Sequence, residues 1–209
     1  MRVLLLHGWP VSERVWVSQV SALRDAGFDP VAPHLYGRGP SIDDWAAHLL
    51  REIEGPLVPV GASMGGYCAL ALARRAPERV VGMVLVGSRA DADSFERRRF
   101  RQEQIIQLRA GEVPDMADED ANLEQLAVAQ EAIRDRLDLT GVAASFGGPL
   151  LVCVGDRDGI VSVDEARELA DNALAGRLEV FTDAGHFVAV DKPQEFNAVL
   201  LDFLSQWKT

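Results

Sequence analysis

Short runs of consecutive apolar residues recur along the chain, and most of them end at or near glycine, proline or aspartate. Runs of this length, bounded by turn-forming residues, predict buried strands. Apolar runs without a polar alternation are typical of a parallel sheet that is covered on both faces. The predicted strands cover residues 3–6, 28–33, 57–61, 80–87, 149–155 and 177–182.

Segments with apolar residues at helical spacing separate these strands. Residues 16–27 end at Gly27, a suitable C-cap, and residues 41–55 begin with the N-cap residue Ser41. Alternating strands and helices predict an α/β fold, with a mostly parallel sheet of about six strands and helices on both faces. Further helices are expected over residues 64–76, 162–176 and 193–207.

A long polar stretch over residues 88–148 interrupts this alternation. It has mostly helical periodicity and no strand pattern, so we interpret it as a short helical cap inserted into the fold. The chain has 209 residues, which is enough for one domain with a substantial core. We therefore expect a single domain over residues 1–209, with the cap within it.

The composition restricts the possible partners. Hydrophobic residues make up 48% of the chain and charged residues 25%, as in ordinary globular proteins. The 21 Lys and Arg residues against 32 Asp and Glu residues give a net charge of −11. Such an acidic surface disfavours nucleic acid and anionic membranes as partners, and it does not restrict a small neutral substrate.

The apolar segments and the cysteines indicate a protein of the reducing cytoplasm. The N-terminal apolar run is too short for a signal peptide, and no run approaches membrane-spanning length. Cys68 and Cys153 stand far apart within apolar runs and lack zinc-ligand spacing, so we expect them to be buried small hydrophobic residues. We therefore expect a cytoplasmic location.

Ser63 stands where the predicted strand over residues 57–61 turns into a helix that starts near Met64. Gly61 and Gly65 flank it in the pattern G-x-S-x-G, where a sharp turn brings neighbouring residues too close for side chains. Ligands bind at the C-terminal ends of strands in parallel sheets. The pattern therefore predicts an exposed hydroxyl at this edge, beside the positive end of a helix.

A serine hydroxyl needs a base to become a nucleophile. His186 follows the last predicted strand and therefore lies at the same edge of the sheet. The base in turn needs a carboxylate, and both Asp156 and Asp158 follow the strand over residues 149–155. The order serine, aspartate, histidine along the chain is the one that a nucleophile at a strand-to-helix turn requires.

Negative charge that develops on a substrate oxygen needs backbone N–H donors. One candidate is the N–H of Met64, and another is the N–H of Trp9 in the loop after the first strand. The ring of Trp9 either lines the pocket for the acyl group or does not contribute to that pocket. We expect His7, directly before this loop, to hold the loop by hydrogen bonds.

The chain resembles the α/β-hydrolase superfamily, and within it the small esterases, lactonases and cofactor-free haloperoxidases. The resemblance covers nearly the whole chain and rests on the segments LLLHGWP, APHLYGRGPS, VGASMGGYCALALARRAPERV, LLVCVGDRDGIVS and DAGHFVAVDKPQEF. It implies that Ser63 is the nucleophile, His186 the base and Asp158, rather than Asp156, the acid. It also implies an oxyanion hole at the N–H groups of Trp9 and Met64, with no cofactor or metal.

Three departures from the family pattern are expected to affect the substrate site. The chain begins at the family's third strand, so the usual N-terminal hairpin is absent. His34 stands where the family often has aspartate, and the cap is shorter than usual. Substrate specificity therefore does not carry over from the family.

We expect a serine hydrolase that cleaves a carboxylic ester, lactone or thioester of a small molecule through an acyl-enzyme. One alternative is a carbon–carbon bond hydrolase or a lyase of the menaquinone-pathway type; another is a ligand-binding relative without catalysis. Arg97, Arg98, Arg99 and Arg101 keep the first alternative open. We expect these arginines instead to form a solvent-exposed face, paired with acidic residues of the cap. The physiological substrate and the oligomeric state stay open.

Overall fold

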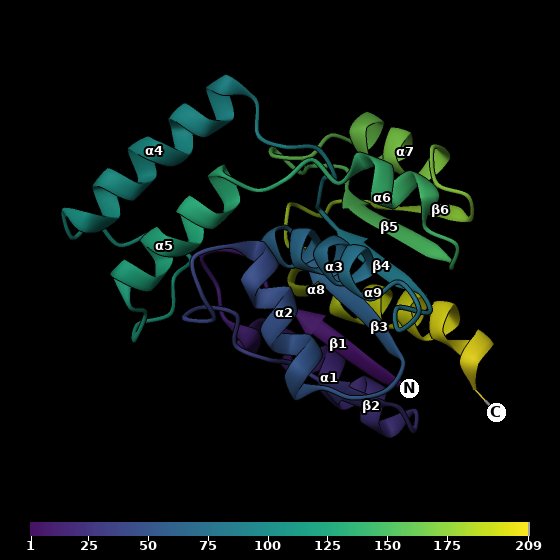
Figure 1. Cartoon of the computed structure of the whole chain (residues 1–209). Helices are drawn as coiled ribbons and strands as arrows, with labels where there is room; N and C mark the ends of the chain where they lie inside the picture. Colours follow the sequence, from purple (N-terminus) through teal and green to yellow (C-terminus); the bar gives the residue numbers. More distant parts are fainter. Residues whose placement is uncertain (209) are drawn as a thin grey trace.

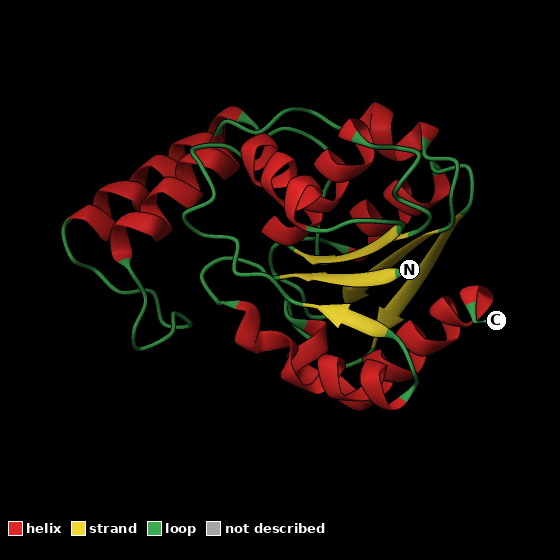
Figure 2. Ribbon diagram, turned by 60° about the horizontal axis from the view of Figure 1, so that its bottom comes forward, coloured by secondary structure: helices red, strands yellow, loops and turns green. Residues whose placement is uncertain are grey.

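The computed structural model describes residues 1–208 and has a six-stranded sheet at its centre. The strands lie in the order β2-β1-β3-β4-β5-β6, and every neighbouring pair is parallel (Figures 1 and 2). The strands are β1 (Arg2–Leu6), β2 (Asp29–Val31), β3 (Leu57–Ala62), β4 (Met83–Val86), β5 (Leu150–Gly155) and β6 (Gly176–Phe181). The predicted α/β fold with a parallel sheet is confirmed.

Two hydrophobic cores lie on the two faces of the sheet, with helices covering each (Figure 2). Alternate residues of β1 face opposite ways: Leu4 and Leu6 belong to one core, Val3 and Leu5 to the other. Both sets are fully buried, which is why this strand is apolar at every one of these positions. One face carries α2 (Ile42–Glu52), α3 (Met64–Arg75) and α7 (Val163–Asp171); the other carries α1 (Val17–Asp25), α8 (Val188–Asp191) and α9 (Pro193–Leu204).

Some element boundaries differ from the prediction. The helix expected over residues 16–27 begins earlier, as a 3-10 helix over Glu13–Trp16 that α1 continues. Ser12 caps this start by accepting a hydrogen bond from the N–H of Arg14, a signal that the apolar spacing does not contain. A second 3-10 helix, Ser205–Trp207, ends the last helical segment.

The segment between β4 and β5 is helical, as its periodicity predicts. Helices α4 (Phe95–Arg109) and α5 (Leu123–Arg134) pack against each other and project from the layered body of the molecule (Figure 1). The third helix, α6 (Thr140–Ser145), packs beside α3 and α7, because its Ala143 joins the core on that face of the sheet. No helix within residues 1–208 is both long enough and apolar enough to cross a membrane.

Candidate active site

Ser63 occupies a strained turn between β3 and α3. Its φ of 49° lies in the left-handed region, which residues other than glycine rarely adopt. Hydrogen bonds hold it there: its N–H donates to the carbonyl of Val86 at 2.8 Å, and its own carbonyl accepts from the N–H of Gly66 and the hydroxyl of Ser88. The turn therefore presents a serine at the C-terminal end of a central strand.

The glycines around Ser63 are required by close backbone contacts. A Cβ atom on Gly65 would overlap the carbonyl of Leu6, and one on Gly61 would overlap the backbone of Gly65. Backbone cannot move aside as a flexible side chain can, so only glycine fits at these two positions. This is the steric reason that the G-x-S-x-G pattern suggests.

Asp158 and His186 form a direct pair at the same edge of the sheet. The Nδ1 atom of His186 lies 2.8 Å from Oδ2 of Asp158. The other carboxylate oxygen accepts hydrogen bonds from the N–H groups of Ile160 and Val161, at 2.7 and 3.0 Å. The Asp158 side chain is fully buried, whereas that of His186 is 12% exposed. The carboxylate is therefore enclosed by protein, and the imidazole is the member of the pair that solvent reaches. Asp156 is exposed and makes no such contact.

Opposing effects act on the Asp158 carboxyl. Burial favours its neutral form, but the hydrogen bond from His186 and those from two backbone N–H groups outweigh this effect. The pKa of Asp158 therefore lies below its ordinary value, and the group is a carboxylate at neutral pH. Because a carboxylate only accepts hydrogen bonds, Nδ1 of His186 carries the proton that points at it, which leaves Nε2 of the neutral ring as an acceptor.

Gly87, after β4, is a residue of this site that the sequence patterns do not reveal. Its φ is 52°, and its N–H donates to the carbonyl of Cys153. A Cβ atom there would lie 3.1 Å from both Oδ2 of Asp158 and Nδ1 of His186. A glycine at the end of a predicted strand is only a weak indication of a functional site, since many strands end in glycine.

A cavity of about 670 Å³ lies over this edge and contains both Ser63 and His186 in its wall. Its apolar lining includes Trp9, Phe100, Met116, Ile133, Ile160 and Phe187. The indole N–H of Trp9 donates to the carbonyl of Leu126 in α5 at 3.2 Å, so the ring joins the loop after β1 to the α4–α5 pair. The ring of Trp9 thus lines the cavity, which is one of the two alternatives that the sequence left open.

Two backbone donors expected to form an oxyanion hole are free. Met64 is the first residue of α3, where an N–H has no partner within its own helix. Within residues 1–208, neither its N–H nor that of Trp9 donates a hydrogen bond to another protein group. Trp9 lines the cavity, and Met64 directly follows Ser63.

His7 braces the loop that follows β1. It is completely buried; its Nε2 accepts the N–H of Leu35 at 2.9 Å and its Nδ1 lies 2.9 Å from the carbonyl of Gly8. Burial, which the hydrogen bond to Gly8 only partly offsets, lowers the pKa of His7 to about 4. The neutral ring is therefore a structural link, as its place in the sequence suggests.

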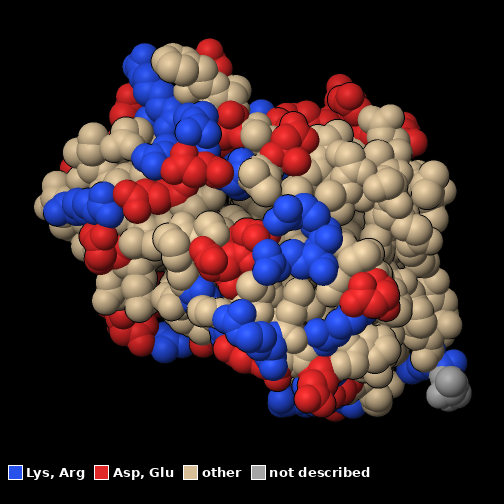
Figure 3. All heavy atoms as spheres, viewed as in Figure 1, with Lys and Arg blue, Asp and Glu red and all other residues tan. Residues whose placement is uncertain are grey.

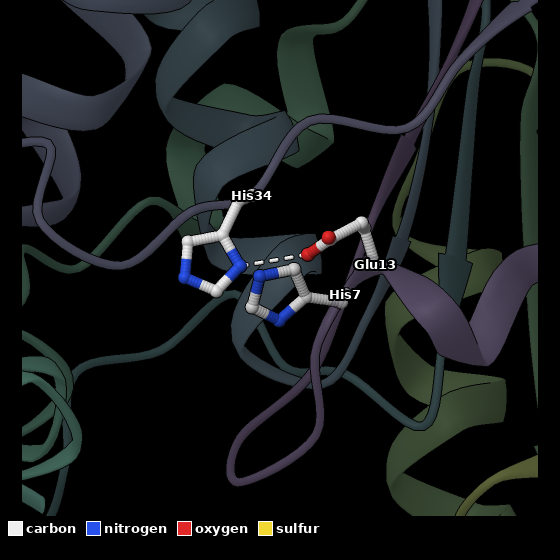
Figure 4. Close-up of side chains that lie close together, drawn as sticks. All are labelled: His7, Glu13 and His34. Carbon is white, nitrogen blue, oxygen red and sulfur yellow. Dashed lines mark hydrogen bonds and ion pairs between the residues drawn. The ribbon is translucent and has the colours of Figure 1, made fainter. Parts of the chain in front are cut away.

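His7, Glu13 and His34 lie close together, with potential metal-ligand atoms within 4.8 Å of one another (Figure 4). Nδ1 of His34 bonds to the carboxylate of Glu13 at 2.7 Å. Both ring nitrogens of His7 are already used by backbone groups, so His7 has no free nitrogen for a metal. We therefore interpret this group as part of the bracing of the loop.

The arginines of α4 separate into two groups, which corrects the expectation of one solvent-exposed face. Arg98 and Arg99 are exposed and pair with Asp135 and Glu103, as expected. Basic and acidic side chains lie next to each other over this part of the surface in Figure 3. Arg97 and Arg101, in contrast, are partly buried and line the cavity above Ser63. The spacing of the arginines along α4 does not show which side of this helix faces the cavity.

Tyr67 also lines the cavity and was not identified from the sequence. It lies in the first turn of α3, four residues after Ser63. The guanidinium of Arg136 lies 4.1 Å from the centre of its ring, a cation–π contact that fixes the ring. Its place in the first turn of the helix that follows Ser63 is the signal that could have identified it.

Known proteins are similar to this chain in sequence and in fold. The model of the alpha/beta hydrolase family matches residues 3–199, so the chain belongs to this family, which confirms the resemblance. A pimeloyl-[acyl-carrier protein] methyl ester esterase from Aromatoleum aromaticum is 39% identical over 92 residues, which cover 41% of this chain and 36% of that protein. An esterase of the same name from Vibrio parahaemolyticus is 24% identical over 241 residues, covering 96% of this chain and 93% of that one.

The fold is also similar to those of solved esterases. A malate-bound thermophilic esterase from Thermogutta terrifontis covers 100% of this chain and 91% of its own, with a TM-score of 0.89 and 26% sequence identity. The named relatives are thus hydrolases, which supports a hydrolase of the α/β class here.

Proposed function

We propose that this protein is a serine hydrolase that cleaves a carboxylic ester of a small molecule through an acyl-enzyme. The observation that carries the proposal is the shared cavity of Ser63 and His186, with His186 held by Asp158 at 2.8 Å. The relatives named as esterases support the same class of reaction.

In this proposal, the hydroxyl of Ser63 attacks the ester carbonyl while Nε2 of His186 takes the proton. Asp158 stabilises the imidazolium that forms. The N–H groups of Trp9 and Met64 donate to the oxyanion of the tetrahedral intermediate. His186 then gives its proton to the leaving alkoxide, so that an alcohol departs and the acyl group stays on Ser63.

The second half of the reaction repeats these roles with water. His186 removes a proton from a water molecule, which attacks the acyl carbonyl and forms a second tetrahedral intermediate. Collapse of this intermediate returns the proton to Ser63 and releases the carboxylic acid. The reaction therefore needs no group beyond the residues named.

The test is turnover of simple esters of increasing acyl length by the wild type and by Ser63→Ala. We expect a loss on the order of 10⁶-fold in kcat for Ser63→Ala, because the three residues act as a unit. Ser145→Ala, in an exposed position of α6, is the control and should leave turnover unchanged. Ester turnover that survives in a folded Ser63→Ala variant would contradict the proposal.

A further inference from the structure

We propose that Arg97 and Arg101 form a subsite for an anionic group of the substrate, so that the preferred ester carries a second, ionised carboxylate. This inference rests on the proposed ester hydrolysis at Ser63. Both arginines belong to the lining of the cavity that contains Ser63 and His186. They lie on α4, and the same cavity is lined by Ser63, which follows β3.

Fewer carboxylates than guanidinium groups lie within ion-pair distance at this wall. The buried carboxylate of Asp93 is shared by Arg136 at 2.7 Å, Arg101 at 3.2 Å and Arg97 at 3.9 Å. Asp91 also pairs with Arg97, at 2.5 Å. Three guanidinium groups thus share two carboxylates within ion-pair distance.

The other charged residues of the cavity, within residues 1–208, make no ion pair with Arg97 or Arg101. Arg89 is bonded to Glu165, so this pair adds no net charge. Asp191 lies beside the loop of His186, where its carboxylate accepts the N–H of Gly185 at 2.7 Å. Within residues 1–208 it makes no ion pair with the arginines of α4.

Both arginines are only partly exposed to solvent. The side chain of Arg97 is 31% exposed and that of Arg101 is 16% exposed. A guanidinium in this partly desolvated position binds a carboxylate more strongly than an exposed one does.

Tyr67 connects this wall to the nucleophile. It lines the same cavity, stands one helical turn after Ser63, and is held by Arg136, which itself bonds to Asp93. The arginine wall is therefore tied through Asp93, Arg136 and Tyr67 to the helix that begins at the catalytic turn. A substrate with its ester at Ser63 and a carboxylate at its far end matches this arrangement.

The experiment compares linear dicarboxylic acid monomethyl esters of increasing length with the matching neutral esters, in which an amide replaces the free acid. We expect the wild type to favour the acid over its amide by tenfold or more in kcat/KM at the best length. Arg97→Gln should remove most of this preference by raising KM for the acid alone. Arg99→Gln, on the exposed side of the same helix, should retain it.

Other outcomes separate this inference from the proposed function. Hydrolysis of both esters without a preference for the acid, in the wild type, would overturn the subsite while leaving the esterase intact. Equal losses for acid and amide in Arg97→Gln would show a structural role and would also overturn it. Arg101 pairs with the buried Asp93, and Arg101→Lys keeps a positive charge beside that carboxylate, so this variant should retain a part of the preference for the acid. Full retention of that preference in Arg97→Gln would contradict the proposal. Hydrolysis of neither ester would overturn the proposed function itself.

Discussion

Replacing Asp158 by asparagine tests whether this carboxylate acts through His186. The variant keeps the shape of the side chain, and its amide oxygen can still accept the N–H groups of Ile160 and Val161. The amide nitrogen then faces Nδ1 of His186 across 2.8 Å. Because both groups would be donors, the ring must move its proton to Nε2, where it can no longer accept the proton of Ser63.

The expected loss follows from two effects. The first is the attraction between the carboxylate and the imidazolium, about 4 kcal/mol for unit charges about 4 Å apart at an effective dielectric constant near 20, or roughly a thousandfold in rate. The second is the unfavourable tautomer of His186. Together they predict a drop in kcat on the order of 10⁴-fold, with little change in KM.

The assay is steady-state hydrolysis of a short-chain p-nitrophenyl ester, with thermal unfolding to verify that the variant is folded. Asp156→Asn is the matched control, since Asp156 is exposed and lies two residues away. We expect this control to retain nearly full activity. A loss below about tenfold in Asp158→Asn, or equal losses in the two variants, would refute the reasoning.

Two further changes test the residues that support the site. The buried His7 has a pKa of about 4, against 6.5 in the unfolded chain. As the pH falls between these two values, the unfolded state binds the proton first. The free energy of unfolding therefore drops, by about 3 kcal/mol at most. His7→Gln preserves an acceptor for the N–H of Leu35 and should flatten this dependence in urea unfolding at several pH values; an unchanged slope would assign the effect to other groups. Gly87→Ala adds a methyl group at a φ of 52° and against His186, so it should lower the free energy of unfolding by about 1–2 kcal/mol and reduce kcat; wild-type stability and turnover would contradict the contact.

Local patterns in the sequence are sufficient to predict much of this architecture. Each strand is a short apolar run because both faces of the sheet are covered, and the turn at Ser63 needs glycines within two residues on either side. The position of His186 follows from the same rule, since it comes directly after a parallel strand. These features depend on neighbours in the chain, and they could be predicted.

The features that could not be predicted depend on contacts between distant segments. The choice between Asp156 and Asp158 required the resemblance, because both follow the same strand and only the folded loop directs one of them to His186. The division of the α4 arginines depends on how the α4–α5 pair packs on the body, which brings Arg136 to Asp93. Spacing along one helix cannot supply that orientation.

The central claim is that Ser63 forms a covalent intermediate with His186 as its base, and covalent labelling tests it most directly. The protein would be treated with a fluorophosphonate, which mimics the tetrahedral intermediate, and the adduct located by peptide mass spectrometry. We predict a single label on the peptide that contains Ser63, formed much more slowly in His186→Ala. Rapid labelling of a different serine, or active enzyme that takes up no label at Ser63, would contradict the account.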